Sequence, residues 1–194
     1  MKLHTAIVLL GPPGSGKGTQ GITLAKKLKY GYFSMGEVLR QVAAKPGDPV
    51  AKRINQIMNR GLIIPKSLIA GIFRDTIKKY LSQPGVIIDG FPREVSQISI
   101  FDKTCKEHDI GDVKVLFLDV SRKSLLERIK KRKTIEVRTD DDPKVVSSRF
   151  LEYRRKTLPI VKLFKKRKLL ITIDGDKTVA GVFKEIIQRL KNEA

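Results

Sequence analysis

The sequence predicts a three-layer α/β/α fold, in which a five-stranded parallel sheet is covered by helices on both faces. Short apolar runs alternate with segments of helical periodicity along all 194 residues. Such alternation is typical of a parallel sheet built from strand–helix–strand units. The hydrophobic content of 41% is sufficient for a buried core, and the length fits one domain.

The expected strands are apolar runs that end at a polar or turn-forming residue. They cover residues 5–10, 32–33, 86–88, 113–120 and 169–174. Helical periodicity is clearest in residues 16–29, 121–131 and 178–190. None of the apolar runs approaches the roughly 20 residues that cross a bilayer. In a sheet of this kind, ligands bind beyond the carboxyl ends of the strands.

Two stretches depart from the strand–helix alternation. Residues 34–65 have a helical pattern throughout, broken by the Lys-Pro-Gly-Asp-Pro sequence at 45–49. Residues 133–143 are short, polar and charged, and lie between two expected helices. We therefore expect a single domain with a helical insertion at 34–65 and a mobile loop at 133–143. The core would then comprise residues 1–33, 66–132 and 144–194.

The charge and cysteine content limit the class of protein. The chain has 40 Lys and Arg against 20 Asp and Glu, a net charge of +20. Between residues 121 and 170 there are 18 basic residues against 6 acidic ones. This excess predicts affinity for polyanions such as nucleotides, nucleic acids or anionic surfaces. The single Cys105 excludes an internal disulfide framework and an all-cysteine zinc site, so we expect a reducing, cytoplasmic compartment.

The strongest motif follows the first expected strand. Residues 11–19 read Gly-Pro-Pro-Gly-Ser-Gly-Lys-Gly-Thr and lead directly into an expected helix. Glycines let backbone N–H groups turn toward phosphate oxygens, and the helix N-terminus adds partial positive charge. Lys17 would reach the β- and γ-phosphates of a nucleotide. Gly18 departs from the general pattern, which has Ser or Thr directly after the lysine.

The ten-residue string GPPGSGKGTQ resembles the adenylate kinase family of nucleoside monophosphate kinases. Three further stretches match that family in order and spacing: residues 34–40 (SMGEVLR), 61–65 (GLIIP) and 89–93 (DGFPR), the last followed by Gln97. Four arginines also fall where the family has its lid arginines, namely Arg128, Arg132, Arg138 and Arg149. The short 133–143 stretch is similar to the short-lid subtype. The resemblance implies the family's P-loop fold, with 34–65 as the monophosphate-binding insertion and 133–143 as the lid.

The resemblance also implies a reaction, the reversible Mg²⁺-dependent conversion of ATP and AMP into two ADP. The nucleophile is a phosphate oxygen that is already ionised, so catalysis depends on positioning and charge stabilisation rather than on a general base. The implied catalytic residues are Lys17, Arg93, Arg132, Arg138 and Arg149. The implied ATP site comprises Gly14, Ser15, Gly16, Lys17, Gly18, Thr19, Arg128 and Arg132.

The acceptor and metal sites follow from the same resemblance. The implied AMP site comprises Ser34, Met35, Arg40, Ile63, Ile64, Gly90, Arg93, Gln97, Arg138 and Arg149. Asp89 would act on Mg²⁺ through water, because Mg²⁺ rarely loses its waters, and Thr19 is a second candidate ligand. We expect no zinc.

Two alternatives stay open at this point. Met35 favours a UMP/CMP-type kinase, because the adenylate kinases usually have Thr there, whereas Gln97 favours AMP. The +20 charge favours a P-loop protein that binds nucleic acid, although neither interleaved aromatic residues nor a recognition motif supports it. We expect small-molecule nucleotides as partners, no specific nucleic-acid partner, no membrane and a monomer. Nonspecific binding of polyanions is left open.

Overall fold

The computed structural model describes residues 4–135 and 142–192, with side chains for all of these except 131–135. Its centre is a five-stranded sheet in the order β2-β3-β1-β4-β5, and every pair of neighbours is parallel. The strands are β1 (His4–Leu10), β2 (Gly31–Ser34), β3 (Gly85–Asp89), β4 (Ile110–Asp119) and β5 (Leu170–Asp174). The predicted fold class and all five strands are thereby confirmed.

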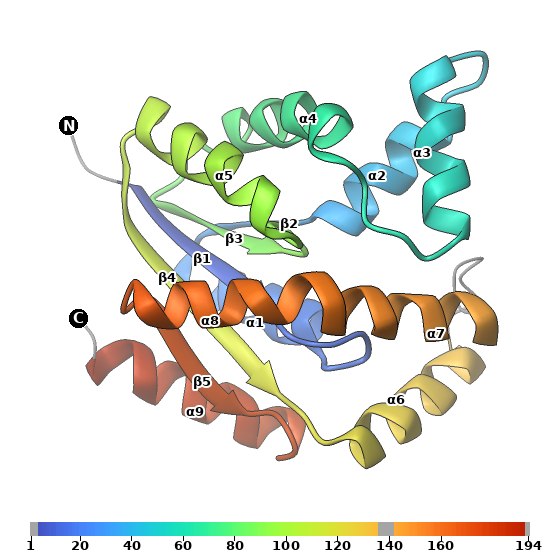
Figure 1. The fold of residues 1–194 in the computed structure, drawn as a ribbon. Helices are drawn as coiled ribbons and strands as arrows, with labels where there is room; N and C mark the ends of the chain where they lie inside the picture. The colour runs from blue at the N-terminus through green and yellow to red at the C-terminus, as the bar shows by residue number, and fades with distance from the viewer. Residues whose placement is uncertain (1–3, 136–141, 193–194) are drawn as a thin grey trace.

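Helices cover both faces of the sheet. Successive side chains of β1 point to opposite sides, so each face has apolar side chains to bury. Ile7 and Leu9 pack with helices α1 and α9, whereas Ala6, Val8 and Leu10 belong to a core shared with α4, α5 and α8 (Figure 1). The bounds of these helices are α1 Lys17–Leu28, α4 Lys66–Lys78, α5 Val95–Glu107, α8 Leu158–Lys166 and α9 Val179–Asn192. Among the described residues, no helix combines the length and the apolarity needed to cross a membrane.

The segment between β2 and α4 contains two helices, α2 (Met35–Ala43) and α3 (Pro49–Asn59). Asp48 caps α3, since its carboxylate accepts hydrogen bonds from the N–H groups of Val50 and Ala51. The expectation of helix as far as residue 65 is wrong, because α3 ends at Asn59. Gly61 then adopts a φ of +68°, a left-handed conformation that glycine adopts without strain.

Helix α6 (Arg122–Ile135) follows the sheet's fourth strand, and three helical elements from residue 143 onward form one long rod. We expected a polar loop at 133–143, but helix α6 includes its first residues, 133–135. Helix α7 (Pro143–Glu152), a π-helical turn at Tyr153–Thr157 and α8 then follow one another without a break. Figure 1 shows these three elements as one continuous rod across the molecule.

Candidate active site

One cavity of about 1130 Å³ lies at the carboxyl ends of β1, β2 and β3. Its volume exceeds the roughly 300 to 1,000 Å³ of a typical small-ligand pocket. It is lined by the 11–19 loop, by residues of α2, and by the segment that follows β3. The predicted site residues that line it are Gly14, Ser15, Gly16, Lys17, Gly18, Thr19, Ser34, Arg40, Ile63, Asp89, Gly90, Arg93, Arg128 and Arg149.

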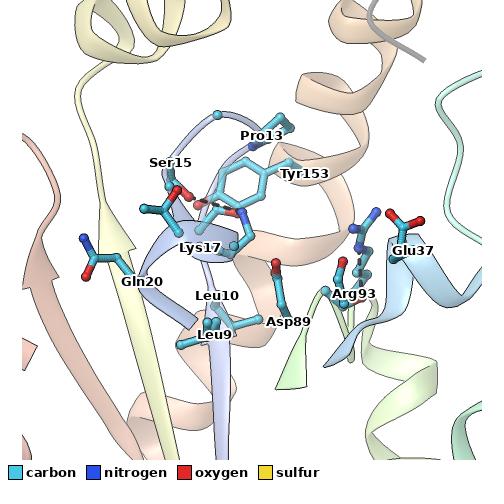
Figure 2. Close-up of a pocket in the computed structure, with 18 of the residues that line it drawn as sticks. Leu9, Leu10, Pro13, Ser15, Lys17, Gln20, Glu37, Asp89, Arg93 and Tyr153 are labelled. Carbon is cyan, nitrogen blue, oxygen red and sulfur yellow. Dashed lines mark hydrogen bonds between the residues drawn. The ribbon is translucent and has the colours of Figure 1, made fainter. Parts of the chain in front are cut away.

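The loop between β1 and α1 forms the first wall of this cavity. Gly14 and Gly16 have φ angles of +82° and +91°, which lets the backbone turn tightly into the N-terminus of α1. The ammonium group of Lys17 donates to the carbonyl oxygens of Gly11 at 2.8 Å and Pro12 at 2.9 Å. Figure 2 shows the Lys17 ammonium turned back onto the loop, with Asp89 and Arg93 to the other side of it. The arrangement is that of a phosphate-binding loop.

Arg128 ties this loop to the opposite edge of the sheet. Its guanidinium donates to the carbonyl oxygen of Ser15 at 3.3 Å and to that of Gly175 at 2.7 Å. The side chain comes from α6, and Gly175 follows β5. Arg128 therefore fixes the position of the loop as well as lining the cavity.

Asp89 lies at the end of β3, with only 8% of its surface exposed. The hydroxyl of Tyr32 donates to its Oδ2 at 3.4 Å. A Cβ atom on Gly18 would lie 3.9 Å from the same oxygen and 3.6 Å from the Tyr32 hydroxyl. The residue of α1 beside Asp89 is therefore Gly18, and nothing in the described contacts links the exposed Thr19 to that carboxylate.

Two arginines converge on the opposite wall. Arg93 donates from Nε to the carbonyl oxygen of Gly90 at 2.9 Å, and Arg40 pairs with Glu37 at 2.7 Å. A Cβ atom on Gly36 would lie 3.8 Å from an Arg40 nitrogen and 3.9 Å from an Arg93 nitrogen. The guanidinium groups thus approach one small space from two different segments, which suits a phosphate group that accepts several charged hydrogen bonds.

The backbone of Arg93 is held by two buried side chains. The N–H of Arg93 donates to Oε1 of Gln97 at 2.8 Å, and the hydroxyl of Thr157 donates to the carbonyl oxygen of Arg93 at 2.8 Å. Gln97 also donates from Nε2 to the carbonyl oxygen of Ile64 at 3.0 Å. The segment that contains Arg93 is therefore joined both to residues 63–64 and to the π-helical turn.

Three residues expected to contact a base do not line the cavity. Met35 is 0% exposed and packs in the core, because it lies with Leu39 on the buried face of α2. Gln97 is also 0% exposed, and its amide is used by backbone groups. Ile64 is buried, and its carbonyl oxygen is the acceptor for Gln97. In this structure Met35 is a core residue, and Gln97 joins two backbone segments; a base contact by Met35, Gln97 or Ile64 stays a prediction.

The junction of α7 and the π-helical turn supplies site residues that the sequence did not indicate. Glu152 accepts from the N–H of Ile63 at 3.3 Å and pairs with Lys156 at 2.8 Å. Tyr153 also lines the cavity, where burial, and then the negative charge of Asp119, raise the pKa of its phenol. Glu152 and Tyr153 follow Arg149 by three and four residues, a spacing that places all three on one helical face. This spacing was the feature of the sequence that could have indicated them as site residues.

Two predicted arginines cannot be placed. Arg138 lies outside the described residues, and of Arg132 only the backbone, within α6, is described. Among the described residues, no group of three or more His, Cys, Asp or Glu side chains lies close enough to hold a metal. Asp89 is a buried carboxylate beside Gly18, at the start of α1.

The parallel sheet, its phosphate-binding loop and the facing arginines define a P-loop nucleotide kinase. Comparison with known proteins gives the family. The family model for adenylate kinase matches residues 9–169. The chain is 36% identical over 186 residues to an adenylate kinase of Thermus thermophilus, covering 96% of this chain and 97% of that enzyme.

Two further relatives agree with this assignment. The chain is 34% identical to the adenylate kinase of Nitrobacter winogradskyi, over 95% of this chain and 92% of that enzyme. It is 35% identical to the adenylate kinase of Bartonella henselae, over 95% and 99%. The chain belongs to the adenylate kinase family. This confirms the resemblance and the predicted enzyme class, a nucleoside monophosphate kinase.

Proposed function

We propose that this enzyme transfers the terminal phosphoryl group of ATP to AMP, and that the reaction runs in both directions. The observation that carries the proposal is that the Lys17 loop and three arginines, Arg40, Arg93 and Arg149, line one cavity. A single P-loop suffices to bind one triphosphate. Cationic side chains on the facing wall suit a second anionic ligand, and the volume of about 1130 Å³ leaves room for it.

The donor occupies the 11–19 loop in this proposal. Backbone N–H groups of residues 14–19 surround its phosphates, and the N-terminus of α1 adds partial positive charge. Lys17 exchanges its bonds to the carbonyl oxygens of Gly11 and Pro12 for phosphate oxygens. Arg128 holds the loop in place and presents its guanidinium to the nucleotide.

The acceptor phosphate lies between Arg40 and Arg93, and Arg149 approaches from α7. The attacking phosphate oxygen is already ionised, so no side chain has to remove a proton. The arginines align the two phosphates and stabilise the charge that develops between them. An arginine in this role contributes about 10³ to 10⁵ in rate, or roughly 4 to 7 kcal/mol of barrier. We assign the same role to Arg132, in α6, and to Arg138, in the lid at 133–143.

A magnesium ion fits the donor set beside the loop. Asp89 is a single buried carboxylate, and Gly18, which faces it, adds no side chain to the space beside it. One carboxylate with water and phosphate oxygens is the usual environment of Mg²⁺ in kinases. Bound there, the ion would neutralise charge on the phosphates. The protein's contribution is to hold the Asp89 carboxylate in place, and the hydroxyl of Tyr32 does this.

Product analysis with ATP and each monophosphate tests the proposal. AMP, UMP, CMP and GMP are supplied separately with ATP and Mg²⁺, and the diphosphates are separated by ion-exchange chromatography. We expect AMP to give the highest kcat/KM, by at least tenfold. A higher kcat/KM for UMP or CMP would assign the enzyme to the pyrimidine type, and turnover of ATP without any acceptor would reject a second nucleotide site.

A further inference from the structure

The exposed face of the helical rod formed by α7, the π-helical turn and α8 is strongly basic. Six exposed side chains form what we call the basic stripe: Lys144, Arg154, Arg155, Lys162, Lys165 and Lys166. They recur at helical spacing along the exposed edge of the rod, so they face solvent on one side. The first and last are 22 residues apart, which corresponds to about 30 Å along a helix.

No acidic side chain interrupts this stripe. The only acidic residue within 143–166 is Glu152, which is buried and turned toward Ile63 and Lys156. Two other basic residues nearby are already paired, Lys156 with Glu152 and Arg167 with Asp102. Within the described part of the chain, the six residues of the stripe form no ion pair of their own. Their positive charge is therefore available to an external anion.

The length of the stripe favours a polymer over a small anion. About 30 Å is close to one turn of a nucleic-acid duplex, along which phosphates follow each other every few ångströms. All twelve Phe and Tyr side chains of the sequence lie in the described ranges, and none of them is exposed. Proteins that bind single strands stack bases on exposed aromatic rings, so this surface suits the backbone of a duplex better.

The same rod is poorly suited to a lipid surface. An interfacial helix buries an apolar face among the acyl chains. Here the apolar face is already used, because Ile160 and Phe164 are fully buried against the sheet. Leu151 is the one strongly exposed apolar side chain in the described rod. The charge complementarity therefore points to phosphate groups of a nucleic acid.

We propose that the basic stripe binds the phosphate backbone of double-stranded nucleic acid, independently of sequence and separately from the nucleotide cavity. None of its six residues lines that cavity. A nucleotide kinase with this surface can remain associated with nucleic acid while the cavity continues to turn over substrate. The proposal does not depend on which monophosphate the cavity accepts.

A fluorescence anisotropy titration with a labelled 20-base-pair DNA duplex tests it. The full-length enzyme is titrated at several salt concentrations, with ATP and AMP at saturation so that the cavity is occupied. Each cationic contact with a duplex phosphate contributes about 0.9 to the slope of log K against log salt. We expect a slope of about −3 to −5 for the unmodified enzyme.

The decisive comparison uses two triple variants of equal net charge. Arg155→Gln, Lys162→Gln and Lys166→Gln remove half of the stripe. Lys27→Gln, Lys52→Gln and Lys184→Gln remove three exposed cations on α1, α3 and α9. We expect the stripe variant to lose at least tenfold in affinity and about 2 to 3 in slope. The control variant should lose less than threefold, and both should retain kcat and thermal stability.

Three results would overturn the proposal. An equal loss in both variants would mean that net charge alone attracts the duplex. Release of the duplex by ATP and AMP would place it in the cavity. Equal or tighter binding of the unmodified enzyme to phosphatidylserine vesicles, lost in the stripe variant, would assign the stripe to a membrane surface.

Discussion

The two walls of the cavity are built in different ways. The donor wall is almost wholly local: Lys17 bonds to carbonyl oxygens five and six residues before it, within one loop. The acceptor wall is assembled from distant segments, and Arg93 is held by a hydroxyl 64 residues away on the π-helical turn. The donor wall is thus formed within one strand–loop–helix segment, whereas the acceptor wall exists only in the complete fold.

This difference has a functional consequence. A change in the donor wall acts directly on the phosphates and leaves the rest of the cavity intact. A change in the acceptor wall can act indirectly. A residue far away in the sequence, such as Thr157, holds the backbone segment that carries Arg93. The kinetic constants for ATP and for AMP should therefore respond to different variants.

The largest effect is expected at the donor wall, for Lys17→Met. Loss of the ammonium removes the only side-chain cation within the 11–19 loop. The negative charge on the transferred phosphate is then no longer stabilised by that cation. We expect kcat to fall by about 10³ or more, measured in a coupled assay. Lys27→Met, on the exposed side of the same helix, is the matched control and should keep full activity. A Lys17→Met enzyme with more than a tenth of the original kcat would contradict the donor assignment.

The next effect is expected at the acceptor wall, for Arg93→Ala. Charged hydrogen bonds contribute roughly 1.5 to 3 kcal/mol each, so kcat/KM for AMP should fall about a hundredfold. The KM for ATP should change less than twofold, because Arg93 follows β3 on the wall that faces the donor loop (Figure 2). Arg74→Ala provides the control, since Arg74 also donates to a backbone carbonyl but lies on the exposed side of α4. A parallel rise in both KM values would mean that the two walls are not separate.

The sequence predicted the donor wall better than the acceptor wall. The glycines and the lysine of the 11–19 loop are contiguous, so their geometry follows from strand, turn and helix. Met35 is buried in the core, whereas Gly36 and Arg40, four residues apart, lie on the face of α2 that lines the cavity. Thr157 could not be found from sequence, because its partner is 64 residues away and the π-helical turn shifts the helical phase between them.

Thr157→Val tests whether the distant partner positions Arg93. The substitution keeps the shape of the side chain and removes the hydroxyl that bonds to the carbonyl oxygen of Arg93. We expect the KM for AMP to rise about five- to tenfold, in line with about 1 kcal/mol for one hydrogen bond, while the KM for ATP stays unchanged.

The matched control for this variant is Thr76→Val. Thr76 is equally buried, and its hydroxyl donates at 2.7 Å to a carbonyl oxygen within α4. Both variants should lose similar thermal stability, but only Thr157→Val should alter the KM for AMP. If both variants bind AMP normally, Thr157 serves stability alone.

The smallest effect is expected for Glu37→Gln, which should improve the binding of AMP, whereas the variants above impair activity or AMP binding. Glu37 pairs with Arg40 in the structure, with side-chain exposures of 55% and 29%, so the pair adds little stability. Its carboxylate also places a negative charge where the acceptor phosphate should bind. Neutralising it weakens the pair with Arg40 and removes a repulsion, so the KM for AMP should fall about two- to threefold. The gain should shrink as salt is raised from about 50 to about 300 mM, because the partly exposed charges are screened. A rise in the KM for AMP would instead mean that Glu37 is needed to orient Arg40 toward the phosphate.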